Sequence, residues 1–117
     1  MATFLFSYRV PRTPLAQVLA ALDEPAREAR MAAWNAWFER LGDRLVQRGN
    51  PVNDAQTLGT CTDDTRIGGY SLVSADNLDA AVALAKGCPG LAWGGGVEVG
   101  EFIEIGQPQR TQAEART

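Results

Sequence analysis

Residues 85–99, AKGCPGLAWGGGVEV, contain the residue types that most suggest chemistry: a cysteine, two groups of glycines and a tryptophan. A reactive Cys88 thiolate would need a helix N-terminus or a cationic neighbour, but Cys88 comes just after a predicted helix, whose dipole opposes a negative charge. A loop that cradles phosphate follows a strand and opens a helix. Gly94–Gly96 instead follow a helix, precede a strand and lack the Lys-Ser/Thr of a P-loop. We therefore expect a structural connection here, with Cys88 as a small buried residue.

Aromatic residues are stronger candidates for a site, because they gather on the long predicted helix, on two predicted strands and in the glycine-rich loop. Packing in a core accounts for most aromatic residues of a small domain. The alternative is an apolar pocket between the long helix and the sheet, in which tyrosine hydroxyls hold a small ligand, aromatic compounds included. The residues that we expect at such a pocket are Tyr8, Trp37, Tyr70, Cys88 and Trp93.

Metal and cofactor sites have little support in the sequence. The chain has no histidine, the commonest metal ligand and the commonest general base at neutral pH. Its two cysteines, Cys61 and Cys88, form no CxxC pair, so we expect free thiols. Asp63 and Asp64 provide too few oxygens for calcium and are typical of a turn. We expect no metal and no cofactor.

Length and charge narrow the class of protein. A chain of 117 residues fits one domain that can bury a core without help from a metal or a disulfide. The formal net charge is -3, and no stripe of basic residues forms that would neutralise phosphates, so we expect no nucleic-acid partner. Arg40, Arg44 and Arg48 follow one another along a helix and are typical of a solvated face. Without a long apolar run or a signal peptide, we expect a cytoplasmic protein with no membrane partner.

The spacing of apolar residues predicts strands where they alternate and helices where they recur every three or four positions. The predicted strands are residues 3–10, 52–58, 67–75 and 97–105, and the predicted helices are 15–22, 23–49 and 78–85. The long helix has the strongest pattern, with Gly49 as its C-terminal stop. Its predicted buried stripe is Met31, Trp34, Phe38, Leu41 and Leu45. We expect one domain over residues 1–106 and a flexible C-terminal tail over the polar residues 107–117.

The order of these elements predicts an α+β fold. Two βαβ units with right-handed crossovers give a ferredoxin-like βαββαβ arrangement, a four-stranded antiparallel sheet with the helices on one face. The other face of the sheet is left uncovered, although the first strand carries Phe4 and Phe6 on one side and Leu5 on the other. Because large exposed apolar faces mark interfaces, we expect a homodimer that pairs through these sheet faces.

The segment IGGYSLVSADNLDAAVALAKGCPGLAWGGGVEV, residues 67–99, resembles the YCII-related (DGPF-type) family of small bacterial proteins. The tryptophan-bearing helix that ends in LVQRG and the aromatic first strand extend the resemblance over about residues 3–105. Its best parts are the glycine-tyrosine strand, the Leu-Asp-Ala-Ala helix and the Cys-Pro turn. The resemblance implies ferredoxin-like subunits that form a dimeric α/β barrel.

The same resemblance implies less about activity. Most members of the family have no assigned reaction, some are associated with sigma-factor-like regulators, and a few are enzymes, such as a dehydrochlorinase of a chlorinated aromatic compound. The enzymes are linked to a histidine on the first long helix and an aspartate before a proline. Trp37 or Phe38 and Cys88 stand at those positions here, and TDDT stands near the place of the DGPF tetrapeptide. None of these side chains can replace an imidazole and carboxylate pair in moving a proton.

Three functions remain open at this point. The first is a YCII-like homodimer that binds a small ligand in an aromatic-lined cleft without the family's histidine and aspartate. The second is a small enzyme of the lyase or isomerase type that acts on an aromatic or phenolic compound through Tyr8, Tyr70 or Arg9. The third is an interaction module associated with a transcriptional regulator.

Overall fold

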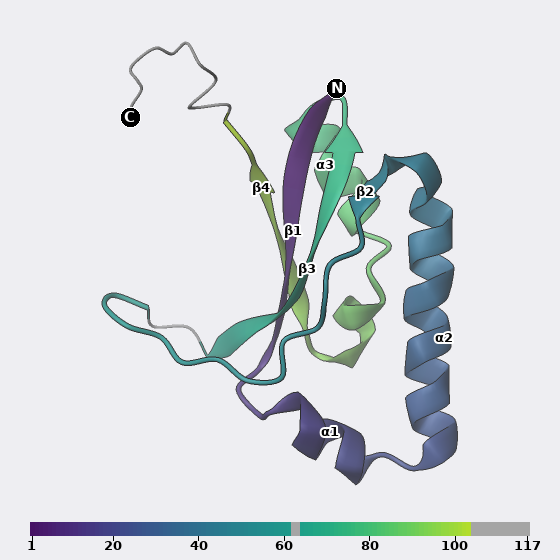
Figure 1. Cartoon of the computed structure of the whole chain (residues 1–117), viewed down its shortest axis with the longest axis vertical. Coiled ribbons are helices and arrows are strands. Elements are labelled where there is room, and N and C mark those ends of the chain that lie inside the picture. The colour runs from purple at the N-terminus through teal and green to yellow at the C-terminus, as the bar shows by residue number, and fades with distance from the viewer. Residues whose placement is uncertain (62–63, 104–117) are drawn as a thin grey trace.

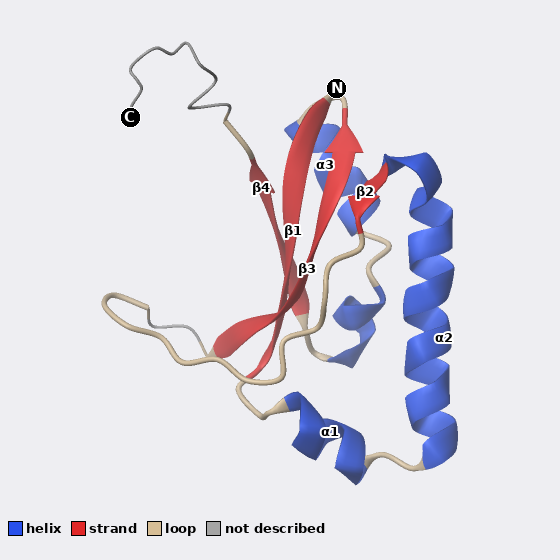
Figure 2. Ribbon diagram, viewed as in Figure 1, coloured by secondary structure: helices blue, strands red, loops and turns tan. Residues whose placement is uncertain are grey.

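A computed structural model describes residues 1–61 and 64–103, and confirms the predicted α+β class and four-stranded antiparallel sheet. The strand order is β2-β3-β1-β4 and the element order is βαββαβ-like (Figure 1). The strands are β1 (Ala2–Pro11), β2 (Leu45–Gln47), β3 (Thr65–Ala75) and β4 (Gly96–Glu101). The helices are α1 (Leu15–Ala21), α2 (Glu24–Leu41) and α3 (Leu78–Ala85), with 3-10 helices η1 (Gly42–Arg44) and η2 (Pro89–Trp93) (Figure 2). The predicted tail, residues 107–117, lies outside the described residues.

The core lies between one face of the sheet and the helices α2 and α3. Alternation along β1 points Phe4, Phe6 and Tyr8 to the same side, and all three are buried. Together with side chains of β3 and both helices they form one cluster, whose other buried members are Trp37, Leu41, Val73, Ala75, Ala81, Ala85 and Cys88. The long central strands therefore carry the core, and β2 and β4 lie at the edges.

Helix α2 is shorter than its sequence pattern predicts. The Asp23 side chain caps its start by accepting a hydrogen bond from the Ala26 N–H (2.9 Å). The helix ends at Leu41, because Gly42 adopts a φ of +55°, a conformation that favours glycine and stops a helix. The prediction of a helix through Gly49 is therefore wrong, and Leu45–Gln47 form the edge strand β2 instead.

The predicted strand over residues 52–58 is also wrong. Only Pro51 makes a β-bridge, to Gly69, and the Val52 N–H donates to the Gly68 carbonyl (3.0 Å). The turn-forming Asn53 explains why the pairing stops, because its carbonyl and side chain accept hydrogen bonds from the start of α1 instead. This segment thus connects the edge of the sheet to α1.

The buried stripe of α2 is rotated from the predicted one. Trp37 is 2% exposed and Leu41 is buried, whereas Met31 is 66% exposed. Figure 1 shows that α2 extends well past β2 toward α1, and no residue of its first half belongs to the core cluster. The predicted burial of Met31 is therefore wrong, although Trp34 and Phe38 do pack against the core.

The second face of the sheet carries Leu5 opposite Leu72 and Ser7 opposite Tyr70. These side chains do not belong to the hydrophobic core that α2 and α3 form with the first face. Within the part of the chain that the structure describes, no helix is long and apolar enough to cross a membrane.

Candidate functional site

A cleft of about 470 Å³ opens on the helix-covered side of the sheet. It is lined by residues of α1, α2, β1, β3, η2 and the segment 48–52. In Figure 1, α1 lies below the sheet and is joined to the lower end of α2. Its volume falls within the range of about 300–1,000 Å³ that is typical of small-molecule sites. The aromatic residues in its lining are Tyr8, Trp34, Phe38, Tyr70 and Trp93.

The aromatic wall of the cleft is a packed cluster rather than a set of separate rings. Trp34 and Phe38 lie one helical turn apart on α2, with ring centroids separated by 5.8 Å. The Tyr8 ring meets the Trp34 ring edge to face at 4.9 Å. Behind them, Trp37 packs against both Tyr8 and Trp34 at 5.9 and 5.8 Å. This contact network fixes the orientation of the wall before any ligand arrives.

The Tyr8 hydroxyl is engaged in a short chain of hydrogen bonds. It donates to the Ser71 Oγ (2.8 Å), which in turn donates to the backbone carbonyl of Arg48 (2.6 Å). Burial raises the pKa of the Tyr8 phenol well above its ordinary value, since the phenolate would lose its hydration. Tyr8 is therefore a neutral donor at physiological pH, and its role is to hold the Arg48 segment against the sheet.

Within residues 1–61 and 64–103, the charged residues that line the cleft are all arginines: Arg27, Arg30, Arg48 and Arg66. The Arg30 guanidinium carbon lies 4.6 Å from the Trp93 ring centroid, and that of Arg48 lies 4.5 Å from the Phe38 ring centroid. Arg48 also donates from Nη2 to the Asn35 Oδ1 (2.6 Å). Arg27 caps the end of α1, because its Nη1 donates hydrogen bonds to the carbonyls of Leu19 and Leu22.

Arg66 is the most buried of the four, at 2% exposure. Its guanidinium donates to the backbone carbonyls of Thr13 (3.0 Å), Val52 (3.0 Å) and Ile67 (2.8 Å). Three separate segments of the cleft are thereby held together by one side chain. Its Nε has no hydrogen-bond partner among the described residues, and carbonyl dipoles rather than a carboxylate surround the charge.

The structure brings only some of the predicted site residues to the cleft. Tyr8, Tyr70 and Trp93 line it, whereas Trp37 and Cys88 lie in the buried core and not in the lining. Tyr8 pairs with Gly69 and Tyr70 pairs with Ser7, so the two tyrosine side chains leave the sheet on opposite faces. Both residues nevertheless belong to the lining of the same cleft.

Cys88 is a free, buried thiol between α3 and η2. Burial raises the pKa of the thiol, an effect that backbone hydrogen bonds from Gly90 and Leu91 only partly offset. A raised thiol pKa does not favour a nucleophile. Among residues 1–61 and 64–103, no three His, Cys, Asp or Glu side chains come together to hold a metal ion. Asp63, part of the predicted acidic turn, lies outside the described residues.

The arginines, Trp34 and Phe38 line the cleft, although the sequence did not assign them to a site. A signal existed for one group: Arg30, Trp34 and Phe38 recur every four positions and so share one helix face. Arg48 was expected on a solvated face, and its place depends on the unexpected end of α2. Arg66 had no local signal, because its partners are distant in sequence.

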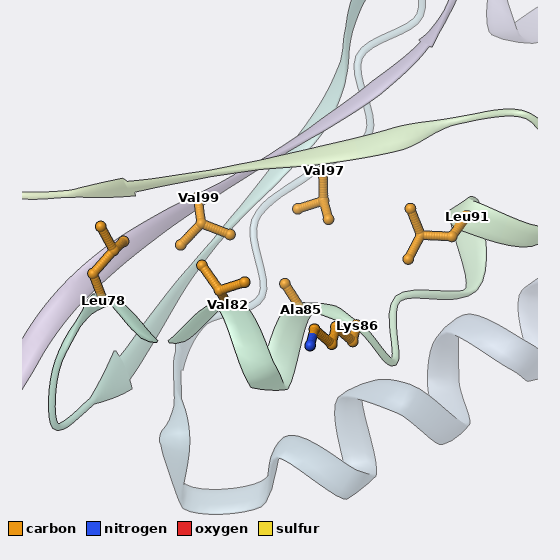
Figure 3. A pocket seen from close by; sticks show the side chains of 7 residues that line it. All are labelled: Leu78, Val82, Ala85, Lys86, Leu91, Val97 and Val99. Atoms are coloured by element: carbon orange, nitrogen blue, oxygen red, sulfur yellow. The ribbon is translucent and has the colours of Figure 1, made fainter. Parts of the chain in front are cut away.

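A second, smaller pocket lies between α3 and β4 (Figure 3). Its volume is about 270 Å³, and Lys86 is the one polar residue in its lining within the part of the chain that the structure describes. The side chains of Val82, Val97 and Val99 face one another across it (Figure 3). With so few polar groups to orient a ligand, it is the weaker candidate.

The chain was also compared with known proteins. No family model matches it, and no curated protein matches it. Function is therefore inferred from the cleft of about 470 Å³.

Proposed function

We propose that this protein binds a small aromatic ligand in the cleft between α1, α2 and the sheet. The observation that carries the proposal is the packed aromatic wall of Tyr8, Trp34 and Phe38 in a cleft of about 470 Å³, whose lining also includes Trp93. Aromatic side chains give a flat ligand both buried apolar area and favourable ring contacts. Arginine donors at the same cleft supply the few polar groups that such sites use for orientation.

The structure supports binding over proton-transfer catalysis at this site. The alternative of a lyase or isomerase relied on Tyr8, Tyr70 or Arg9 as acid or base. The Tyr8 hydroxyl is bonded to Ser71, and Arg9 donates from Nε and Nη2 to Thr65 (3.3 and 3.1 Å). Tyr70 leaves the sheet on the other face from Tyr8. The polar groups of Tyr8 and Arg9 are thus engaged in contacts between strands, which favours binding over proton transfer as the role of the cleft.

Neutral phenols test the binding proposal. We expect 2-naphthol to bind the full chain and to perturb the side chains of the cleft, measured by ligand-observed NMR titration. Trp34→Ala removes part of the aromatic wall and is expected to weaken this binding about tenfold. Leu91→Ala in the α3/β4 pocket is the control and should leave the affinity within about twofold of the wild type. If Leu91→Ala loses binding and Trp34→Ala does not, the ligand binds outside the cleft and the proposal is wrong.

We also propose that two copies pair through the second face of the sheet, as the resemblance to YCII-related proteins implies. The βαββαβ-like element order and the strand order β2-β3-β1-β4 suit a ferredoxin-like subunit of such a dimeric α/β barrel. Leu5 and Leu72 lie opposite each other on that face, outside the core cluster. Pairing of two sheets would bury these leucine side chains and remove their apolar surface from water.

Sedimentation equilibrium checks the dimer. We expect a dimer at tens of micromolar and a monomer for Leu72→Glu, because two carboxylates would be brought together in an apolar interface. Val82→Glu on α3 is the matched control, since it adds the same charge at an exposed position on the helix-covered side. Circular dichroism should show that both variants fold. A wild type that stays monomeric at these concentrations contradicts the sheet-pairing proposal.

A further inference from the structure

We infer that the cleft selects aromatic ligands that carry a negative charge, and specifically aromatic carboxylates. This inference rests on the proposed ligand binding and adds the chemical class of the ligand. Its starting point is the charge of the lining, which among the described residues comprises four arginines and no carboxylate. The chain as a whole has a formal net charge of -3, so this concentration of positive charge is local to the cleft.

Arg30 is the best placed of these cations. It is half-buried and stacks on Trp93 at 4.6 Å, and no described residue accepts a hydrogen bond from its guanidinium. A guanidinium that lies over an aromatic ring keeps its N–H donors available for an anion. Such a fork of donors matches the two oxygens of a carboxylate. Trp93 thus pre-orients Arg30 for an anion beside an aromatic surface.

Arg48 provides a second cation on the other side of the aromatic wall. It stacks on Phe38, which lies eight positions after Arg30 on α2 and so roughly 12 Å away along the helix axis. Its side chain donates to the neutral amide of Asn35, and no carboxylate among the described residues accepts a hydrogen bond from it. The backbone of Arg48 is fixed by the hydrogen bond from Ser71. A flat ligand on Trp34 and Phe38 therefore has a guanidinium near each end of the wall.

Arg66 adds a buried charge to the lining of the same cleft. At 2% exposure it is bonded to three carbonyls, and its Nε has no partner among the described residues. A charge away from water acts on its surroundings more strongly than an exposed one. A neutral ligand would cover the arginines and strip their water without giving them a partner, which is unfavourable. An anionic ligand compensates them, so the cleft should discriminate by charge.

The test compares 1-naphthoate with 1-naphthamide, which have nearly the same shape and differ in charge. With the full chain, ligand-observed NMR titration should show at least about tenfold tighter binding of the carboxylate, the change typical of a charge-assisted hydrogen bond. Raising the salt concentration should weaken the binding of 1-naphthoate and leave the affinity for 1-naphthamide unchanged.

Arginine variants locate the effect. Arg30→Gln should lower the affinity for 1-naphthoate about tenfold and change the affinity for 1-naphthamide by less than about twofold. Arg40→Gln removes the same charge from an exposed position of α2 outside the cleft lining, and should leave both affinities unchanged. Arg48→Gln serves as the second cleft variant if Arg30→Gln does not fold, with the same expected pattern.

The outcomes separate the two proposals. Equal affinities for 1-naphthoate and 1-naphthamide overturn the charge selection and leave aromatic binding in place. Binding of neither compound, nor of 2-naphthol, overturns the proposed function as well. Carboxylate preference that survives both Arg30→Gln and Arg48→Gln would show that these arginines do not cause it, and the inference would then be wrong.

Discussion

Trp37→Ala is expected to lower the free energy of unfolding by about 3–5 kcal/mol, the cost of removing a large buried aromatic side chain and leaving a cavity. Trp37 is 2% exposed and its ring packs against Phe6, Tyr8, Trp34 and Phe38, with centroid distances of 5.5 to 6.1 Å. Few local rearrangements could fill the space, because α2 meets the sheet through this side chain. Urea denaturation monitored by circular dichroism measures the loss.

Trp93→Ala is the matched control for Trp37→Ala. Trp93 is only partly buried, lies in η2 and does not belong to the core cluster. We expect a cost of about 1 kcal/mol for its truncation, within the usual range for point substitutions. If both variants lose the same stability, Trp37 does not anchor α2 and the described core is misassigned.

The fold was predictable where one local pattern is unambiguous. The alternating apolar residues of β1 and the helical spacing of α3 define those elements to within a residue or two, and they confirm the α+β class. The end of α2 was not predictable, because Leu45 continues the helical spacing past Gly42. The glycine conformation, with its φ of +55°, overrides that spacing and turns the chain into β2.

The candidate site was predictable only in part, for a related reason. Tyr8 and Trp93 could be proposed from residue type and position, and both line the cleft. The arginines could not, because a basic residue on a helix is usually solvated. Contacts between segments that are distant in sequence bring Arg48 and Arg66 to the cleft. One of them is the hydrogen bond from Ser71 to the Arg48 carbonyl. No local pattern encodes such contacts.

The cleft also depends on how closely the segment after β2 approaches β3. Arg48 receives a hydrogen bond from Ser71, Pro51 bridges Gly69, and the Val52 N–H donates to the Gly68 carbonyl. The Val52 carbonyl in turn accepts from Arg66. One wall of the cleft is therefore an irregular continuation of the sheet edge, and its position decides where the Arg48 guanidinium lies.

Gly49→Ala is expected to lower the free energy of unfolding by about 3 kcal/mol or more, since it combines backbone strain with a steric clash. Gly49 has a φ of +76°, and a Cβ there would overlap the Tyr70 carbonyl oxygen and lie 2.8 Å from the Tyr70 carbonyl carbon. The segment would have to move away from β3. Binding of 1-naphthoate should weaken together with stability, because Arg48 moves with this segment.

Gly59→Ala separates the two causes of that loss. Gly59 has nearly the same φ, +72°, but nothing lies within 4 Å of a Cβ at this position. Its substitution carries only the backbone strain, about 1 kcal/mol, and should leave 1-naphthoate binding unchanged. The difference between the two variants in urea denaturation then measures the close approach of Gly49 to β3. Equal losses would mean that the segment is free to shift, and that the wall carrying Arg48 is not fixed by its packing on Tyr70.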